Sequence, residues 1–380
     1  MTTNADNPVS DLLDGAAELL DLPVHLHRAA VSAYTDVGDF MASNLSGDDD
    51  WTVYPQGSMR LGTVVLPELD GEYDIDSVAL RHIAKDRTTR LELRDAVGAV
   101  LRAYVDDREG TEGAPIGLKP GKRCWTLQFD EPFHMDILPA IPDTANPDTG
   151  ISITDRSYTR WLVSDPIGYA DWFHSRMAYA FELEHKELAK AASVNIQQIP
   201  VETVKTKLHR AVQILKIHRN RYFADTPELC PASVVITTLA GWSFHHEANL
   251  ADTLLAMLDE MPTQIERDGD AYVVLNPVQD GENFADRWTD DHAVHFAKWI
   301  TALREDILAA LGVRTGLNHA VARLGSAFGQ DLMAKSAEHY GTQMSAMRGA
   351  STGALAVGAT GLLTSGGSGT KVRPHRFDGA

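Results

Sequence analysis

The chain has 380 residues and a formal net charge of −19, with 53 acidic residues against 34 basic ones. Nucleic-acid binding depends on Lys and Arg side chains that neutralise phosphates, so this balance disfavours nucleic acid as a partner. No apolar run approaches the roughly 20 residues that a membrane-spanning helix needs, and no signal peptide is recognisable. With only 2 cysteines, disulfide frameworks and cysteine zinc sites are also excluded, and we expect a cytoplasmic protein without a membrane partner.

The first 170 residues divide into a helical part and a strand-rich part. From Ser10 to about Ser43, apolar residues recur every three to four positions, which predicts two helices separated at Pro23. Residues 88–104 predict a further amphipathic helix. Strand-like composition is found in four runs, at residues 63–66, 74–80, 125–129 and 133–138. This pattern is typical of a small mixed α+β module.

After about Asp165 the sequence predicts a mainly helical region. The helical segments are 165–192, 201–222, 231–247, 250–260, 288–311 and 315–347. From Gly349 to Gly369 the composition is that of a flexible linker. We therefore expect three parts, namely residues 1–170 with the N-terminal helices and the catalytic lobe, 171–345 as a helical lobe, and 346–380 as a flexible tail.

Three aspartates in the strand-like runs carry the chemical signal. Asp74 and Asp76 are two residues apart, so in a strand both carboxylates lie on one face, with Ile75 on the other. Asp136 stands among apolar neighbours in the run 133–138, where a carboxylate costs stability unless it is paired or binds a metal. Three such acids can hold two Mg²⁺ ions, with Mn²⁺ as an alternative, for an in-line displacement at phosphorus.

A small-residue turn precedes these acids. Gly57 permits a close approach of the backbone to a phosphate, and Ser58 offers a hydroxyl and an N–H group. Gln56 either contacts the nucleotide or braces the turn. A paired-aspartate spacing alone occurs by chance in many acidic proteins, but the ordered set of Gly-Ser, Asp-x-Asp and a third strand aspartate is far more specific.

This ordered set resembles the DNA-polymerase-β-like nucleotidyltransferase superfamily. The more detailed resemblance is to the bacterial cGAS/DncV-like nucleotidyltransferases, the CD-NTases of CBASS antiphage systems. It is carried by the runs Tyr54–Thr63, Tyr73–Asp76 and His134–Ile137, and by the helix Lys205–Arg219. The resemblance covers roughly residues 20–340.

The resemblance implies an α+β, two-lobed polymerase-β-like nucleotidyltransferase fold, with a small mixed catalytic sheet, a helical C-terminal lobe and nucleotides in the cleft between the lobes. It implies an enzyme that joins nucleoside triphosphates into a cyclic di- or trinucleotide second messenger, with release of pyrophosphate. By position, Asp74, Asp76 and Asp136 would be the catalytic metal ligands, and Asp136 would also help to deprotonate the attacking ribose hydroxyl. The nucleotide-binding residues would be Gln56, Gly57, Ser58, Lys207 and Ser233.

Several alternatives stay open at this point. Lys207 and Lys216 are nine residues apart on a predicted helix and face differently, so at most one would reach a given phosphate. Ser233 either touches nucleotide or is an ordinary first-turn serine. Other functions are nucleotidyl transfer to RNA or protein, linear oligoadenylate synthesis, and non-catalytic nucleotide sensing.

The expected partners are nucleoside triphosphates and a downstream effector reached through the product. The resemblance adds an E1/E2-like ligase that would conjugate the C-terminal tail. This chain ends in Gly379-Ala380 rather than in glycine, so an ordinary tail is the competing interpretation. The sequence leaves open which bases are joined and through which linkage.

Overall fold

The computed structural model describes residues 7–44, 50–66, 71–121, 123–154, 157, 159–191, 204–312, 316–349, 355–357, 363–365 and 370–371. The chain divides into two compact units. The sheet unit comprises Asp21–Arg176 and Leu275–Asn283, and the helical unit comprises Met1–Leu20, Met177–Val274 and Phe284–Ala380. Each unit is described by itself below.

The sheet unit is built on a seven-stranded mixed sheet whose main path runs β1-β2-β5-β4-β3. β2 and β5 are parallel, and the other strand pairs are antiparallel. β6 pairs with the end of β5, and β7 pairs with β6. The strands are β1 (Trp51–Pro55), β2 (Tyr73–Arg81), β3 (Pro115–Pro120), β4 (Trp125–Phe129), β5 (Phe133–Pro142), β6 (Ile151–Thr154) and β7 (Trp161–Ser164).

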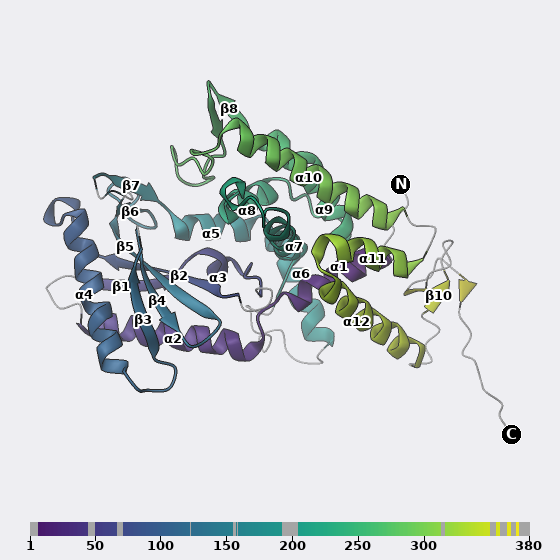
Figure 1. Ribbon diagram of the computed structural model, residues 1–380, viewed down its shortest axis with the longest axis horizontal. Helices are drawn as coiled ribbons and strands as arrows, with labels where there is room; N and C mark the ends of the chain where they lie inside the picture. The colour runs from purple at the N-terminus through teal and green to yellow at the C-terminus, as the bar shows by residue number, and fades with distance from the viewer. Residues whose placement is uncertain are drawn as a thin grey trace. The chain divides into compact units, whose positions relative to one another are not determined.

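Two long helices, α2 (Val24–Asn44) and α4 (Arg90–Arg108), cover one face of this sheet (Figure 1). Their apolar stripes bury the inward residues of β2, β4 and β5, including Ile75, Leu127 and Met135. Gly98 of α4 lies so close to Trp125 that an added Cβ would stand 2.2 Å from the indole ring. The opposite face carries a smaller apolar cluster toward β6, β7 and α5 (Pro166–Ser175).

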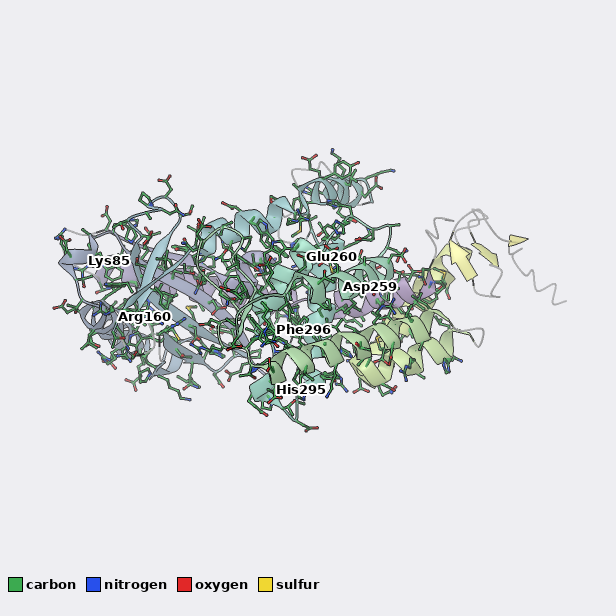
Figure 2. The ribbon with its side chains drawn as sticks, turned by 90° about the horizontal axis from the view of Figure 1, so that it is seen from above. Lys85, Arg160, Asp259, Glu260, His295 and Phe296 are labelled. Carbon is green, nitrogen blue, oxygen red and sulfur yellow. The ribbon has the colours of Figure 1, made fainter. Side chains whose placement is uncertain are left out.

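Two short elements complete the sheet unit, α3 (Gly57–Leu61) and the 3-10 turn η1 (Lys85–Arg87). Lys85, labelled in Figure 2, lies over the Trp161 ring with its Nζ 5.7 Å from the ring centroid. The same Nζ donates a hydrogen bond of 3.4 Å to Ser152 Oγ. Lys85 therefore ties η1 to both β6 and β7.

The helical unit is centred on α7, whose residues from Leu208 to His218 are mostly buried. In Figure 2, Phe296 lies on α10, and Asp259 and Glu260 lie on α9. The helices and turns are α1 (Pro8–Leu19), α6 (Ala178–Ala191), α7 (Lys207–Tyr222), η4 (Pro227–Leu229), α8 (Ser233–Trp242), α9 (Leu250–Glu260), η5 (Met261–Gln264), α10 (Asp290–Leu311), α11 (Leu317–Phe328) and α12 (Gln330–Gly349). A hairpin of β8 (Glu266–Asp268) and β9 (Ala271–Val273) follows η5. In the described part of the chain, no helix has both the length and the apolar character needed to cross a lipid bilayer.

The mixed α+β class with a small sheet is confirmed, but several local expectations are wrong. Residues 63–66 form no strand, because α3 ends at Gly62 in the left-handed conformation and Thr63 N–H donates back to Ser58 O at 3.0 Å. The expected helix 165–192 is two helices, α5 and α6. The expected helix 315–347 is also two, interrupted at Gly329 with φ of 107°.

The division of the chain differs from the expected one at both ends. α1 belongs to the helical unit rather than to the sheet unit, because its apolar residues pack against α7, α9, α11 and α12. In the tail, β10 (Leu355–Val357) pairs with β11 (Leu363–Ser365) and β12 (Thr370–Lys371). The other tail residues, including the Gly379-Ala380 end, lie outside the described residues.

Candidate active site

The two aspartates of β2 share one face of the sheet, as the alternation of a strand requires. Ile75 between them is 1% exposed in the helix-covered core, so Asp74 and Asp76 lie on the opposite face. In the parallel pairing of β2 with β5, Asp76 is the direct partner of Asp136, and Asp74 is the partner of His134. The three predicted acids therefore lie on adjacent strands of a single face.

The Gly57 turn lies directly against Asp76. Gln56 N–H donates to the Asp76 carbonyl oxygen at 2.8 Å, which fixes the start of α3 on β2. Gly57 has φ of 60°, and a Cβ added to it would stand 2.3 Å from Asp76 Oδ2. Only glycine fits this contact, because the backbone conformation and the space both exclude a side chain. The Gln56 side chain makes no capping hydrogen bond to the helix.

Ser58 follows in the first turn of α3. Its carbonyl oxygen accepts from Thr63 N–H at 3.0 Å, and the helix ends at Gly62 with φ of 66°. The short segment that carries Ser58 is therefore fixed at both ends. The Gln56 N–H bonds to the Asp76 carbonyl oxygen of β2, and the Thr63 N–H bonds to the Ser58 carbonyl oxygen. The structure therefore brings Gln56, Gly57 and Ser58 beside the aspartate row, as the sequence predicts.

His134 lies between Asp74 and a second acidic residue, Glu72. Its Nε2 lies 3.0 Å from Asp74 Oδ1, and its Nδ1 lies 3.0 Å from Glu72 Oε2. A neutral imidazole has one ring proton and can donate to only one of these carboxylates, whereas an imidazolium can donate to both. The Asp74 side chain is 62% exposed, and the contact with His134 helps to orient its carboxylate.

Asp136 is held by residues of β4 and the turn before it. Thr126 Oγ1 donates to Asp136 Oδ1 at 2.5 Å, and Thr126 is the direct antiparallel partner of Asp136. Cys124 also hydrogen-bonds the Asp136 carboxylate, and burial first, then the negative charge of Asp136, raises the pKa of the Cys124 thiol to about 11. The thiol therefore stays protonated at neutral pH and acts as a donor to Asp136, not as a nucleophile.

The donor chemistry of this row fits a hard divalent cation. Two carboxylates on neighbouring strands repel one another, and a cation between them removes that cost. Within the described ranges, no three His, Cys, Asp or Glu side chains already form a cluster able to hold a metal. Mg²⁺ is commonly bound by one or two protein carboxylates together with substrate phosphates and water, so the Asp76–Asp136 pair suffices as a protein contribution.

The remaining predicted residues belong to the helical unit. Lys207 begins α7, and its Nζ lies 3.9 Å from Glu184 Oε1. Ser233 begins α8, and its hydroxyl accepts from Arg219 Nη1 at 3.0 Å. The same Nη1 donates to Pro231 O at 2.9 Å. Ser233 thus has a defined structural partner, which favours the structural interpretation of this serine, and no contact here assigns either residue to a nucleotide.

Sequence reasoning missed Thr126, Cys124 and Arg219 as partners of the site residues. A signal existed for Thr126, because Trp125, Leu127 and Phe129 are the apolar half of an alternating strand and place Thr126 on the polar face. The pairing of β4 with Asp136 had no such signal, since register between strands is not readable from one strand alone. Arg219 was hidden because a long basic residue in a helix has many possible partners.

The chain is similar to curated cyclic dinucleotide synthases over most of its length. It is 28% identical over 367 residues to a c-di-GMP synthase of Roseivirga ehrenbergii, covering 94% of each chain. It is 28% identical over 315 residues to the cyclic dinucleotide synthase CdnG of Bradyrhizobium diazoefficiens, covering 75% of this chain and 72% of the relative. No protein-family model matches the sequence.

The fold agrees with a solved structure of the same kind. The CD-NTase CdnG of Bradyrhizobium diazoefficiens, determined in complex with GTP, superimposes with a TM-score of 0.69 at 23% identity, covering 88% of this chain and 100% of that one. This similarity establishes the polymerase-β-like fold. The two sequence relatives are cyclic dinucleotide synthases, which agrees with the phosphoryl-transfer chemistry that the aspartate row on β2 and β5 indicates. The chain therefore has the polymerase-β-like fold of the CD-NTase CdnG and is similar to cyclic dinucleotide synthases over most of its length.

Proposed function

We propose that this chain is a CD-NTase that joins nucleoside triphosphates into a cyclic dinucleotide and releases pyrophosphate at each transfer. The pairing of Asp76 with Asp136 across two parallel strands, with Asp74 on the same face, is the observation that carries the proposal. An acidic row of this kind, next to a glycine turn, suits phosphoryl chemistry in which positioning and charge neutralisation dominate.

GTP is the proposed substrate, and c-di-GMP is the proposed product. The support comes from the c-di-GMP synthase of Roseivirga ehrenbergii, to which 94% of this chain aligns, and from the GTP complex of the fold relative CdnG. In each of two transfers, a ribose hydroxyl oxygen forms a bond to an α-phosphorus, and the bond from that phosphorus to the bridging oxygen of the pyrophosphate breaks. The second transfer closes the ring.

We assign the roles as follows. Asp74, Asp76 and Asp136 would hold two Mg²⁺ ions, which supply charge neutralisation for the transferring phosphoryl group. Asp136 accepts the proton of the attacking hydroxyl. Ser58 hydrogen-bonds donor phosphates, and the absence of a side chain at Gly57 lets the turn lie against Asp76.

Lys207 is proposed to contact the triphosphate, as the resemblance of its helix implies; its Nζ lies 3.9 Å from Glu184 Oε1, a long ion pair that a phosphate could replace. Ser233 is a weaker candidate because its hydroxyl is already bonded to Arg219. Conjugation of the C-terminus by an E1/E2-like ligase stays a prediction, because residues 372–380 lie outside the described residues.

The test is direct product analysis. The protein is incubated with labelled GTP, ATP, CTP or UTP, singly and mixed, with Mg²⁺ or Mn²⁺, and the products are treated with phosphatase and identified by mass spectrometry. We expect a phosphatase-resistant product of c-di-GMP mass from GTP alone. Asp136→Asn should abolish it, whereas Asp130→Asn, at an exposed turn, should not.

Other results identify other functions. A phosphatase-sensitive product would indicate linear oligonucleotide synthesis, and label on added RNA or on protein would indicate transfer to that acceptor. Tight GTP binding without turnover under every condition would indicate a nucleotide sensor. Each of these outcomes contradicts cyclic dinucleotide synthesis.

A further inference from the structure

The third carboxylate of the acidic row has a dedicated hydrogen-bond donor on the neighbouring strand. Thr126 of β4 is the register partner of Asp136, and its hydroxyl lies 2.5 Å from Asp136 Oδ1. Both residues are half-buried on the polar face of the sheet, while their strand neighbours Leu127 and Ile137 are fully buried on the other face.

This donor is rigid. Threonine is β-branched, so its χ1 angle is restricted, and a central strand further fixes the direction of its hydroxyl. A hydroxyl that donates to an ionised carboxylate makes a short, charge-assisted bond, which agrees with the 2.5 Å separation. Together with the hydrogen bond from Cys124, this bond sets the rotation of the Asp136 carboxyl group about χ2, and the rigid Thr126 hydroxyl fixes the position of Oδ1.

We propose that Thr126 is a positioning residue for Asp136, holding one carboxylate oxygen so that the other is directed to the divalent cation of the active site. The inference rests on the proposed function for the identity of that cation. Partners that orient metal-binding carboxylates typically contribute about tenfold to a hundredfold in metal affinity or activity. In this role Thr126 acts through Asp136 and not through a contact of its own with substrate or cation.

A purely structural role for Thr126 makes a different prediction. In that case the hydroxyl only satisfies a half-buried carboxylate, and its removal lowers the stability of the fold without changing how the metal is bound. Metal binding measured without turnover separates these two roles. The control is Thr52 on β1, an exposed threonine of the same sheet, whose hydroxyl lies 2.8 Å from His82 Nε2.

The experiment compares the full-length wild-type chain with Thr126→Val, Thr126→Ser and Thr52→Val. Mn²⁺ is titrated alone and with a non-hydrolysable GTP analogue, and bound metal is followed by electron paramagnetic resonance. Thermal unfolding of each variant is recorded in parallel. If Thr126→Val does not fold, Thr126→Ala compared with Thr126→Ser gives the same information.

For Thr126→Val we expect the half-saturating Mn²⁺ concentration to rise about tenfold or more. Thr126→Ser, which keeps the hydroxyl, should stay within about threefold of wild type, and Thr52→Val should match wild type. Raising the metal concentration should restore turnover in Thr126→Val. Wild-type metal binding by Thr126→Val, or equal impairment of the serine and valine variants, would overturn the proposal. Absence of product from the wild-type protein would instead contradict the proposed function, because the binding comparison needs no turnover.

Discussion

Gly57 is the residue of the site that tolerates least change. Its φ of 60° is a conformation that costs about 1–2 kcal/mol for residues with a Cβ. In addition, an alanine Cβ would stand 2.3 Å from Asp76 Oδ2 and would displace that carboxylate or the turn. A displacement of about 1 Å at a reacting centre can lower the rate about a hundredfold.

Gly57→Ala should therefore reduce product formation at least about a hundredfold while the protein still folds. Gly110→Ala is the matched control, because Gly110 has φ of 78° and an added methyl group would meet no atom within 4 Å. Gly110→Ala should lose about 1–2 kcal/mol of unfolding free energy and Gly57→Ala at least as much, and only Gly57→Ala should lose activity. Equal activity in the two variants would show that the contact with Asp76 does not matter.

The positions of the acidic residues could be predicted from the sequence, whereas the contacts with their hydrogen-bond partners could not. The shared face of Asp74 and Asp76 follows from strand alternation within one segment. The burial of Ile75, which is 1% exposed, agrees with this alternation. The contact of Thr126 with Asp136 depends on the register between two strands, and the contact of His134 with Glu72 depends on side-chain rotation. Neither the register between strands nor the rotation of a side chain can be inferred from the local sequence pattern.

At the scale of elements, α7 and α10 are joined by a buried pair. Trp299 Nε1–H donates to His218 Nδ1 at 2.8 Å, so this nitrogen accepts and the imidazole proton lies on Nε2. The Nε2 atom lies 3.9 Å from Asp306 Oδ2. Burial, with a smaller contribution from the charge of Arg221, lowers the pKa of His218 to about 4.

This depressed pKa makes the stability of the helical unit dependent on pH. The unfolded chain takes up a proton on His218 near pH 6.5, whereas the folded chain resists it until about pH 4. The full stability is therefore present above pH 6.5 and is lost as the pH falls toward 4. Between about pH 7 and about pH 5, His218 should account for a loss of about 2 kcal/mol.

Denaturant unfolding at these two pH values tests this effect. His218→Gln keeps a hydrogen-bond acceptor for Trp299 but cannot titrate, so its stability should fall about 2 kcal/mol less than that of wild type over the same interval. His295→Gln changes a half-buried histidine of α10, labelled in Figure 2, and should keep the wild-type pH dependence. The idea fails if wild type and His218→Gln lose the same free energy.

Helices were predictable from the sequence where the apolar repeat extends over several turns. Helices at 88–104 and 250–260 correspond to α4 and α9, because an amphipathic stripe with clear caps needs no tertiary information. The short strands β1, β3, β6 and β7 went unpredicted, because runs of four to six residues carry too little alternation to be recognised. The strand expected at 63–66 failed because the Gly62 turn bonds Thr63 N–H to Ser58 instead of to a neighbouring strand.

At the scale of the whole molecule, the two units are not continuous in sequence. Residues Leu275–Asn283 join the sheet unit although both flanking segments belong to the helical unit. Two hydrogen bonds join the ends of this segment. Asn276 N–H donates to Glu282 O at 2.8 Å, and Asn276 Nδ2 donates to Glu282 Oε2 at 2.7 Å. A helix or strand pattern does not reveal such an arrangement, because the contacts that define it join segments far apart in the chain.

The assignment of α1 to the helical unit gives a further prediction. Gly15 of α1 faces Ser336 of α12, whose hydroxyl donates to Leu12 O at 2.6 Å, and a Cβ at Gly15 would stand 2.8 Å from Ser336 Oγ. Gly15→Val should force these helices apart and cost about 2 kcal/mol or more, since overpacking and a lost buried hydrogen bond act together.

The matched change is Gly341→Val on α12, where an added Cβ meets nothing within 4 Å. Because valine is a slightly better helix former than glycine, this variant should be neutral or slightly stabilised. Calorimetric unfolding of both variants gives the test. If α1 is an integral part of the helical unit, Gly15→Val should lower the melting temperature of that unit while leaving the transition of the sheet unit in place. The absence of any shift in the transition of the helical unit would place α1 outside that unit, since its packing against α12 is the contact that the substitution breaks.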